Sequence, residues 1–320
     1  MGRNNEKRIV IIGGGTGLST LLRGLKNFPL HITAIVTVAD DGGSSGRLRD
    51  DYDIPPPGDV RNVMAALSDV EPLVEEMFQY RFAHSADLGG HSLGNLMLAA
   101  LTDITGDFTH AIREMSRVLN LKGTVLPAAN QRITLHAELS DGTIVTGESK
   151  IPTYDLKINK VYLTPHDVEP LSETVTSLQS ADMIVIGPGS LYTSILPNLL
   201  VESIRKAIIE STAKKVYICN LMTQAGETKG YTAADHVQAL YDHVGSPFID
   251  TILLNDVVMP PEIRKLYEME KAAPVEYEME KLSGLVPEIV MKSIATSREG
   301  NIRHEASKVA AWLVENMEMR

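Results

Sequence analysis

Residues 8–41 read RIVIIGGGTGLSTLLRGLKNFPLHITAIVTVADD, and this stretch decides the fold class. A β-branched apolar run meets a glycine turn, after which leucines recur at helical spacing from Leu18 to Leu25. A second β-branched run, residues 31–38, ends at two aspartates. Strand, glycine turn, helix and strand in this order predict a βαβ unit with parallel strands and a right-handed crossover.

The same rhythm returns in the second half of the chain. Residues 181–200 predict a buried strand, a glycine loop and a helix, and residues 214–220 and 248–255 predict two further strands. Thr232, with Asp235 three residues on, predicts a capping box that opens a helix. Between the two halves, residues 59–121 read mostly as helix because apolar side chains recur in stripes.

Residues 130–165 change to a period of two, and Asp141-Gly142 between the alternating runs is a strong hairpin signal. This segment predicts a small antiparallel β insert. We therefore expect residues 1–320 to form one α/β domain that contains this insert. Its core would be Rossmann-like and doubly wound, with a mainly parallel sheet and helices on both faces.

Composition narrows the class of protein. The 320 residues are 43% apolar and 22% charged, which is ordinary for a soluble globular protein. The net charge of -11 argues against a nucleic-acid partner, although a local arginine group could still attract a small phosphorylated ligand. One cysteine, Cys219, excludes an intramolecular disulfide and fits a reducing compartment. With no apolar run long enough for a membrane span, we expect a cytoplasmic protein.

The first glycine turn is a candidate anion site. A strand that turns through glycines into a helix presents free amides and the positive end of the helix dipole. The candidates are Gly13, Gly14, Gly15, Thr16 and Gly17. Leu18 stands where the dinucleotide fingerprint has its third glycine, so NAD is expected only as an adventitious occupant. A purely structural tight turn is the alternative interpretation.

Two carboxylates and a run of small residues follow the second predicted strand. Asp40 and Asp41 could accept sugar hydroxyls or hold Mg²⁺ against a phosphate, and a solvated turn is the alternative. The next residues could form an amide nest with hydroxyl donors and a guanidinium group for phosphate. They are Gly42, Gly43, Ser44, Ser45 and Arg47. A flexible linker is the alternative interpretation of this run.

Two more segments open helices with polar residues. In the first segment, Asp59 could cap the helix. The positive charge of Arg61 in the first turn interacts unfavourably with the helix dipole unless the side chain faces an anion. The candidates there are Gly58, Asp59, Arg61 and Asn62. In the second, His91 and Asn95 lie four residues apart on one helical face. His91 could act as a general acid or be merely structural.

A second strand–glycine–helix junction contributes Gly187, Gly189 and Ser190. Two such junctions suit a ligand with two phosphates, or one that spans the switch point of the sheet. The polar loop after the strand at residues 214–220 could form hydrogen bonds that recognise a base or a sugar. Its candidates are Asn220, Thr223, Gln224 and Glu227. Cys219 is expected to be buried rather than nucleophilic.

Taken together, six motifs resemble the gluconeogenesis factor family (YvcK-like), within the superfamily of the 2-phospho-L-lactate transferases (CofD-like). They are GGGTGLS, ADDGGSSGRLR, PPGDVRN, GHSLGN, GPGSLYTSILPNLL and CNLMTQAGET. The resemblance implies a Rossmann-like core with an added subdomain and binding of UDP-sugars such as UDP-N-acetylglucosamine. It also implies a cytoplasmic role in cell shape during growth on gluconeogenic carbon sources. No reaction is firmly attached to this branch.

Two hypotheses about function follow. The first is a nucleotide-sugar sensor that requires no cofactor, which is favoured because no nucleophile–base pair is evident. The second is a Mg²⁺-dependent transferase like the family's cousins, in which Asp40 and Asp41 would hold the metal and His91 would assist proton transfer. The expected partner is a small-molecule nucleotide sugar. A homodimer is compatible with either hypothesis, and the regulatory protein partner of a sensor is unknown.

Overall fold

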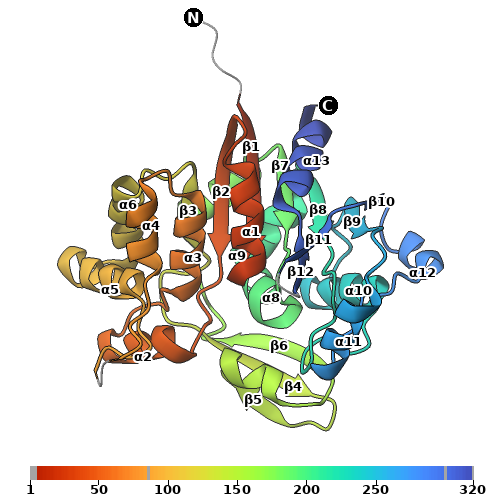
Figure 1. Ribbon diagram of the computed structural model, residues 1–320, viewed down its shortest axis with the longest axis horizontal. Coiled ribbons are helices and arrows are strands. Elements are labelled where there is room, and N and C mark those ends of the chain that lie inside the picture. The colour runs from red at the N-terminus through yellow and green to blue at the C-terminus, as the bar shows by residue number, and fades with distance from the viewer. Residues whose placement is uncertain (1–5, 85–86, 299–300, 319–320) are drawn as a thin grey trace, which may run out of the picture.

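The computed structural model of this chain describes residues 6–84, 87–298 and 301–318. In these residues, seven parallel strands form the central sheet in the order β3-β2-β1-β7-β8-β9-β10 (Figure 1). The strands are β1 (Lys7–Gly13), β2 (Leu30–Val36), β3 (Thr124–Pro127), β7 (Met183–Ile186), β8 (Lys214–Ile218), β9 (Thr251–Asn255) and β10 (Glu288–Lys292). The predicted parallel α/β sheet is confirmed.

The sheet grows outward from β1 in two directions, with β2 and β3 on one side and β7 to β10 on the other. Because crossovers between parallel strands are right-handed, opposite directions of growth place the connecting helices on opposite faces. Helix α1 (Gly15–Leu25) packs with α3 (Gly58–Leu67) and α13 (Ala306–Glu318), and α9 (Glu202–Glu210) packs with α7 (Ser172–Gln179) and α8 (Leu196–Leu199). The connections that follow the paired strands β1 and β7 therefore lead to opposite faces, which makes this position the switch point of a doubly wound sheet.

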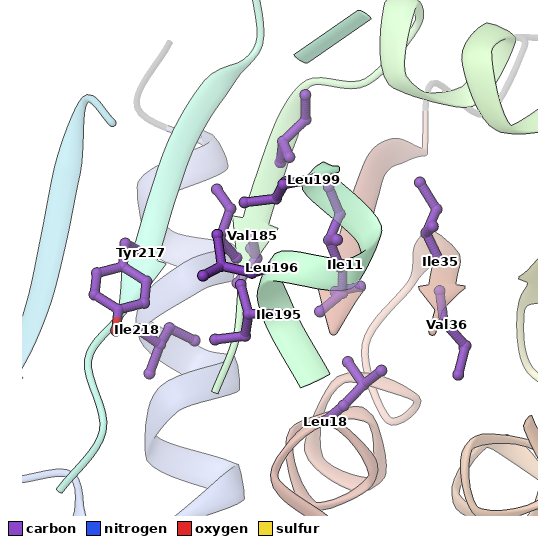
Figure 2. Packing of buried hydrophobic residues seen from close by; sticks show 14 of the residues in the cluster. Ile11, Leu18, Ile35, Val36, Val185, Ile195, Leu196, Leu199, Tyr217 and Ile218 are labelled. Atoms are coloured by element: carbon purple, nitrogen blue, oxygen red, sulfur yellow. The ribbon is translucent and has the colours of Figure 1, made fainter. Parts of the chain in front are cut away.

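The hydrophobic core is formed by side chains on both faces of the central sheet. Figure 2 shows Ile11 of β1, Val185 of β7 and Ile218 of β8 in the same cluster, with Leu196 and Leu199 of α8 packed beside them. Both faces of these parallel strands are covered, so their sequences are continuous apolar runs rather than alternating ones. This burial fixes the strand ends from which the loops of the candidate site emerge.

Among the described residues, five helices lie between β2 and β3 in the chain. They are α2 (Gly43–Tyr52), α3, α4 (Pro72–Gln79), α5 (Leu93–Thr105) and α6 (Phe108–Val118). The sequence predicts helical structure for residues 59–121, whereas the helix at residues 43–52 is not predicted, because that run is interpreted as an amide nest or a flexible linker. Later in the chain, α10 (Ala233–Val244) begins with the predicted capping box of Thr232 and Asp235 and ends at Gly245. None of the helices in the described part of the chain combines the length and apolar character needed to cross a membrane.

The predicted antiparallel insert is present as a three-stranded sheet in the order β5-β4-β6. Its strands are β4 (Thr134–Leu139), β5 (Ile144–Thr146) and β6 (Ile158–Thr164), and a 3-10 helix, η1 (Glu148–Thr153), joins β5 to β6. The Asp141-Gly142 hairpin is confirmed, with the Gly142 amide donating to the Leu139 carbonyl at 2.9 Å. In Figure 1 the insert lies beyond the carboxyl ends of the central strands.

The last sixty residues contain more structure than the charged, mixed sequence indicates. They hold α11 (Pro261–Met269), α12 (Met279–Ser283), strand β10 and a hairpin of β11 (Ala295–Arg298) and β12 (Asn301–His304). The predicted closing helix is confirmed as α13. Strand β12 contacts α1, which brings the end of the chain back to the first glycine turn.

Candidate functional site

Two glycine junctions meet where β1 and β7 end. Gly13 closes β1, and Gly187 follows its neighbour β7. A Cβ added to Gly17 would lie 2.6 Å from the carbonyl oxygen of Pro188, closer than real side chains tolerate. Glycine at this position therefore lets the start of α1 approach the second junction closely.

A cavity of about 450 Å³ opens at this meeting point. Its volume falls in the range of small-molecule pockets, and its place at the switch point is where doubly wound sheets bind ligands. Four segments line it, namely 14–20, 188–194, 220–225 and the C-terminal residues Tyr267, Glu270, Ala272, Ile302, Arg303 and His304. The cavity is thus built from both halves of the sheet and from the end of the chain.

The cavity brings together nine of the residues predicted from sequence: Gly14, Gly15, Thr16, Gly17, Gly189, Ser190, Asn220, Thr223 and Gln224. Several of them hold one another. The Gln224 Nε2 donates to the Ser190 Oγ at 2.8 Å, and the Gly189 amide donates to the Asn220 Oδ1 at 3.4 Å. The loop after β8 therefore fixes the shape of the second glycine junction.

Glu227 was expected to contact ligand, but the structure places it outside the cavity lining and inside the protein. Its carboxylate accepts the Tyr192 amide at 3.1 Å and the Thr193 hydroxyl at 3.0 Å. Burial raises the pKa of Glu227 to about 7, although these two hydrogen-bonding residues oppose the shift. Glu227 thus holds the turn that follows the second junction.

Sequence reasoning missed the contribution of the C-terminal hairpin. Arg303 on β12 is the single lysine or arginine among the described residues that line the cavity, and it makes no ion pair within that part of the chain. The Tyr267 hydroxyl, from α11, accepts the Ile302 amide at 2.9 Å, which fixes the ring beside Arg303. Gly300 between two short runs is a turn signal in the sequence that could have indicated this hairpin.

His304 lines the cavity, and Cys219 lies next to it, buried in the protein. The His304 Nε2 lies 3.1 Å from the carbonyl oxygen of Cys219, so this nitrogen carries the proton and donates. Burial lowers the pKa of His304 to about 4 and raises the pKa of the Cys219 thiol to about 12. Both groups are therefore neutral near pH 7, and Cys219 is buried as expected.

Asp59 does not cap α3, so that prediction is wrong. The helix already begins at Gly58, and no side chain caps it. The Asp59 carboxylate instead lies against Gly14 and near the backbone amide of Gly15, which places the first turn of α3 beside the first glycine junction. Burial and the nearby charge of Asp40 raise the pKa of Asp59 to about 7.

Asp40 and Asp41 do not line the cavity. The Asp40 carboxylate accepts the Gly42 amide at 2.9 Å, and the Asp41 carboxylate accepts the Ser149 amide of the insert at 2.9 Å. Next to them, Glu148 has its pKa raised to about 8 by burial and then by Asp40, Asp59 and other carboxylates. These carboxylates form an acidic cluster between the insert and the first turn of α3.

The sequence predicts Asp40 and Asp41 as possible ligands of Mg²⁺, and both belong to this acidic cluster. Among the described residues, no group of three or more histidine, cysteine, aspartate or glutamate side chains is arranged to hold a metal. Mg²⁺ is commonly bound through one or two carboxylates together with substrate phosphates. Asp40 and Asp41 each accept one backbone amide, so each keeps one carboxylate oxygen that fits that role beside Asp59.

The other predicted residues gather in a second group away from the cavity. The Ser44 Oγ lies 3.0 Å from the His91 Nδ1 and accepts the Asn95 Nδ2 at 3.1 Å. Arg47 donates to the Gly89 carbonyl at 2.6 Å, and Arg61 donates to Gln79 and Asn62. Five predicted residues (Ser44, Arg47, Arg61, His91 and Asn95) therefore surround the N-termini of α2, α3 and α5 instead of facing the first glycine turn.

Comparison with known proteins gives consistent matches. The family model described as 2-phospho-L-lactate transferase CofD matches residues 9–295. The gluconeogenesis factor of Bacillus subtilis is 61% identical over 310 residues, which cover 97% of this chain and 98% of that protein. The gluconeogenesis factor of Halalkalibacterium halodurans is 58% identical and covers 97% and 96%. A crystal structure of a Bacillus halodurans protein has a TM-score of 0.95 at 58% identity and covers 97% and 99%.

Proposed function

Because this chain belongs to the CofD family and, within it, to the gluconeogenesis factors, we propose that it binds a nucleotide sugar in the cavity at the switch point. The observation that carries the proposal is the convergence of two glycine junctions and one arginine on a single cavity of about 450 Å³. UDP-N-acetylglucosamine is the ligand we propose. In this role the protein is a sensor and requires no cofactor.

The diphosphate would lie between the first glycine turn and the C-terminal hairpin. The first amides of a helix have no intrahelical partner, and Thr16 and Gly17 lie in that first turn of α1. The Asp59 carboxylate lies near the Gly15 amide, so the phosphate would use the amides that follow it. Arg303 would supply the positive charge, because one guanidinium group can donate two parallel hydrogen bonds to two phosphate oxygens.

The base and the sugar of the ligand would contact the lining residues that the diphosphate leaves free. The Tyr267 ring offers an aromatic surface on which a nucleobase can stack. Asn220 and Gln224 also line the cavity and offer amide groups, and each is already held by one hydrogen bond to the second junction. Side chains fixed in this way lose less conformational entropy when a ligand binds.

Such a ligand would connect this protein to the supply of cell-wall precursors. We propose that it acts in the cytoplasm and supports cell shape during growth on gluconeogenic carbon sources. The names of its relatives support the gluconeogenic part of this proposal. The unmatched charge of Arg303 supports an anionic ligand.

Isothermal titration calorimetry with UDP-N-acetylglucosamine tests the proposal. We expect saturable binding with a dissociation constant of about 1 mM or lower, because weaker complexes are rarely specific at metabolite concentrations. NAD and GDP serve as comparison ligands for the same cavity. Absence of binding by UDP-sugars up to about 10 mM would refute the proposed ligand class.

A Mg²⁺-dependent transferase is the second candidate function. The observation that favours it is the acidic cluster, in which Asp59 and Glu148 both have raised pKa values beside Asp40. When bound, Mg²⁺ would stabilise negative charge on a leaving nucleotide. Release of nucleoside monophosphate from a nucleoside-diphosphate-linked donor in the presence of Mg²⁺ and an acceptor would support it. An intact donor with every acceptor tested would exclude it.

A further inference from the structure

Three arginines lie near the start of α2, α3 and α5 without a direct ion pair among the described residues. Arg47, Arg61 and Arg81 form no ion pair with any residue in the described part of the chain. Their hydrogen bonds go to neutral oxygens, with Arg47 donating to Gly89 and Arg81 donating to Gly90. In a protein with a net charge of -11, a cluster of unpaired guanidinium groups is unusual.

Arg61 gives the strongest indication of a missing anion, because its side chain is only 6% exposed. Its terminal nitrogens donate to Gln79 at 2.9 Å and Asn62 at 2.6 Å, but its Nε has no hydrogen-bond partner. Burial and then the nearby Arg81 lower the pKa of Arg61 to about 10, while the nearby Asp59 opposes the shift. Asp59 forms no ion pair with Arg61, and a buried cation without a direct anionic contact is strongly unfavourable unless a ligand supplies the opposite charge.

Polar groups with spare hydrogen-bonding capacity surround these arginines. His91 lies close enough to Arg47 and Arg81 for both to lower its pKa, after burial, while Asp51 opposes the shift. Its Nδ1 contacts the Ser44 Oγ, and Asn95, only 2% exposed, has an Oδ1 without a partner. The amides at the start of α2 lie next to this group and add positive potential.

From this arrangement we propose a second anion site, formed by Arg47, Arg61, Arg81, His91 and Ser44, that binds a phosphoryl group. Arg47 and Arg81 are exposed and would receive the ligand, and the buried Arg61 lies close enough to Arg81 for their charges to interact. A Cβ added to Gly43 would meet nothing within 4 Å, so the approach to the start of α2 is open. The guanidinium fork matches phosphate oxygens, and the Asn95 Oδ1 would accept a hydroxyl of the same molecule.

The proposed anion site is separate from the nucleotide-sugar cavity. None of its five residues lines that cavity. Helix α3 connects the two, since Asp59 in its first turn contacts Gly15 of the cavity while Arg61, two residues on, belongs to the anion site. The site therefore goes beyond the proposed function and does not depend on it.

Titration of the full chain with inorganic phosphate, at constant ionic strength, tests the site. We expect a dissociation constant of a few mM or lower, and at least ten-fold weaker binding in the double variant Arg47→Gln/Arg81→Gln. Both side chains are exposed, so this variant should fold. The matched control Arg113→Gln/Arg117→Gln removes two exposed arginines from α6 and should bind phosphate like the wild type.

A second titration in the presence of saturating UDP-N-acetylglucosamine separates the two sites. We expect phosphate binding to persist, and we expect Arg303→Ala to leave it unchanged. Complete displacement by the nucleotide sugar would overturn the proposal, because the phosphate would then be occupying the cavity. Equal binding by the wild type and the Arg47→Gln/Arg81→Gln variant would overturn it, as would no binding up to about 20 mM. The first titration needs no nucleotide sugar, so it tests the site even if the proposed function fails.

Discussion

The carboxylate of Glu227 accepts the hydroxyl of Thr193 at 3.0 Å, although the two residues lie 34 positions apart in the sequence. Glu227 comes from the loop after β8, and Thr193 from the turn after the second glycine junction. This buried contact joins two segments that the sequence analysis treated as separate ligand-binding segments. It makes Glu227 a residue that positions the cavity wall.

Substitution of Glu227 by alanine should destabilise the fold. It leaves the Tyr192 amide and the Thr193 hydroxyl buried without a partner, which costs about 1–3 kcal/mol for each unsatisfied group. Glutamine can accept from the amide and donate to the hydroxyl, so Glu227→Gln should lower the free energy of unfolding by no more than about 1 kcal/mol. Urea unfolding at pH 7 measures both variants, and equal losses would contradict the positioning role.

The pH dependence of stability should reveal Glu148. Its pKa is raised from 4.5 to about 8 in the folded protein, chiefly by burial. The folded state therefore binds the proton more tightly than the unfolded chain, so the free energy of unfolding falls as pH rises from 4.5 through 8. Glu148→Gln should remove this loss and stabilise the protein above pH 8.

We expect a gain of at least about 1 kcal/mol at pH 8.5, the value of a pKa difference of about one unit. This gain in the free energy of unfolding is much smaller than the full pKa shift of Glu148 would imply, because part of the side chain reaches solvent. At pH 4.5 the gain should disappear. Glu210→Gln, on the exposed surface of α9, is the control and should show no such dependence. A gain of the same size at both pH values would refute the assignment.

The contact between the two glycine junctions should be sensitive to a single methyl group. Gly17→Ala would place a Cβ 2.6 Å from the Pro188 carbonyl oxygen, so the junctions must separate. We expect a loss of about 1–3 kcal/mol in stability together with weaker binding of UDP-N-acetylglucosamine. Gly284→Ala is the matched control, because its added Cβ would meet only the Lys281 carbonyl at 3.4 Å. Unchanged stability in Gly17→Ala would show that the junctions are loosely packed.

Local sequence signals predicted the central fold well. The βαβ unit of residues 8–41, the hairpin at Asp141-Gly142 and the capping box at Thr232 each depend on neighbouring residues, and the structure confirms all three. The seventh strand, β10, and the β11–β12 hairpin were missed. Their short runs are only partly buried, so they lack the apolar pattern that marks a strand.

The arrangement of the site depends on long-range contacts that a single sequence does not specify. The two glycine junctions were predicted to approach each other because parallel strands end at the same edge of a sheet, and they line one cavity. Arg303 reaches that cavity only because β12 packs against α1, 285 or so positions earlier in the chain. Arg47 and Arg61 were predicted to serve the same phosphates, but α2 and α3 turn them towards Gly89 and Gln79.

Calorimetric titration of the Arg303→Ala variant with UDP-N-acetylglucosamine tests the central claim most directly. Arg303 is the single cationic side chain among the described residues of the cavity, and its charge-assisted contacts to a diphosphate should contribute about 1.5–3 kcal/mol. The account predicts binding weakened by about ten-fold to a hundred-fold, while Arg117→Ala on α6 binds like the wild type. Undiminished binding by Arg303→Ala would contradict it.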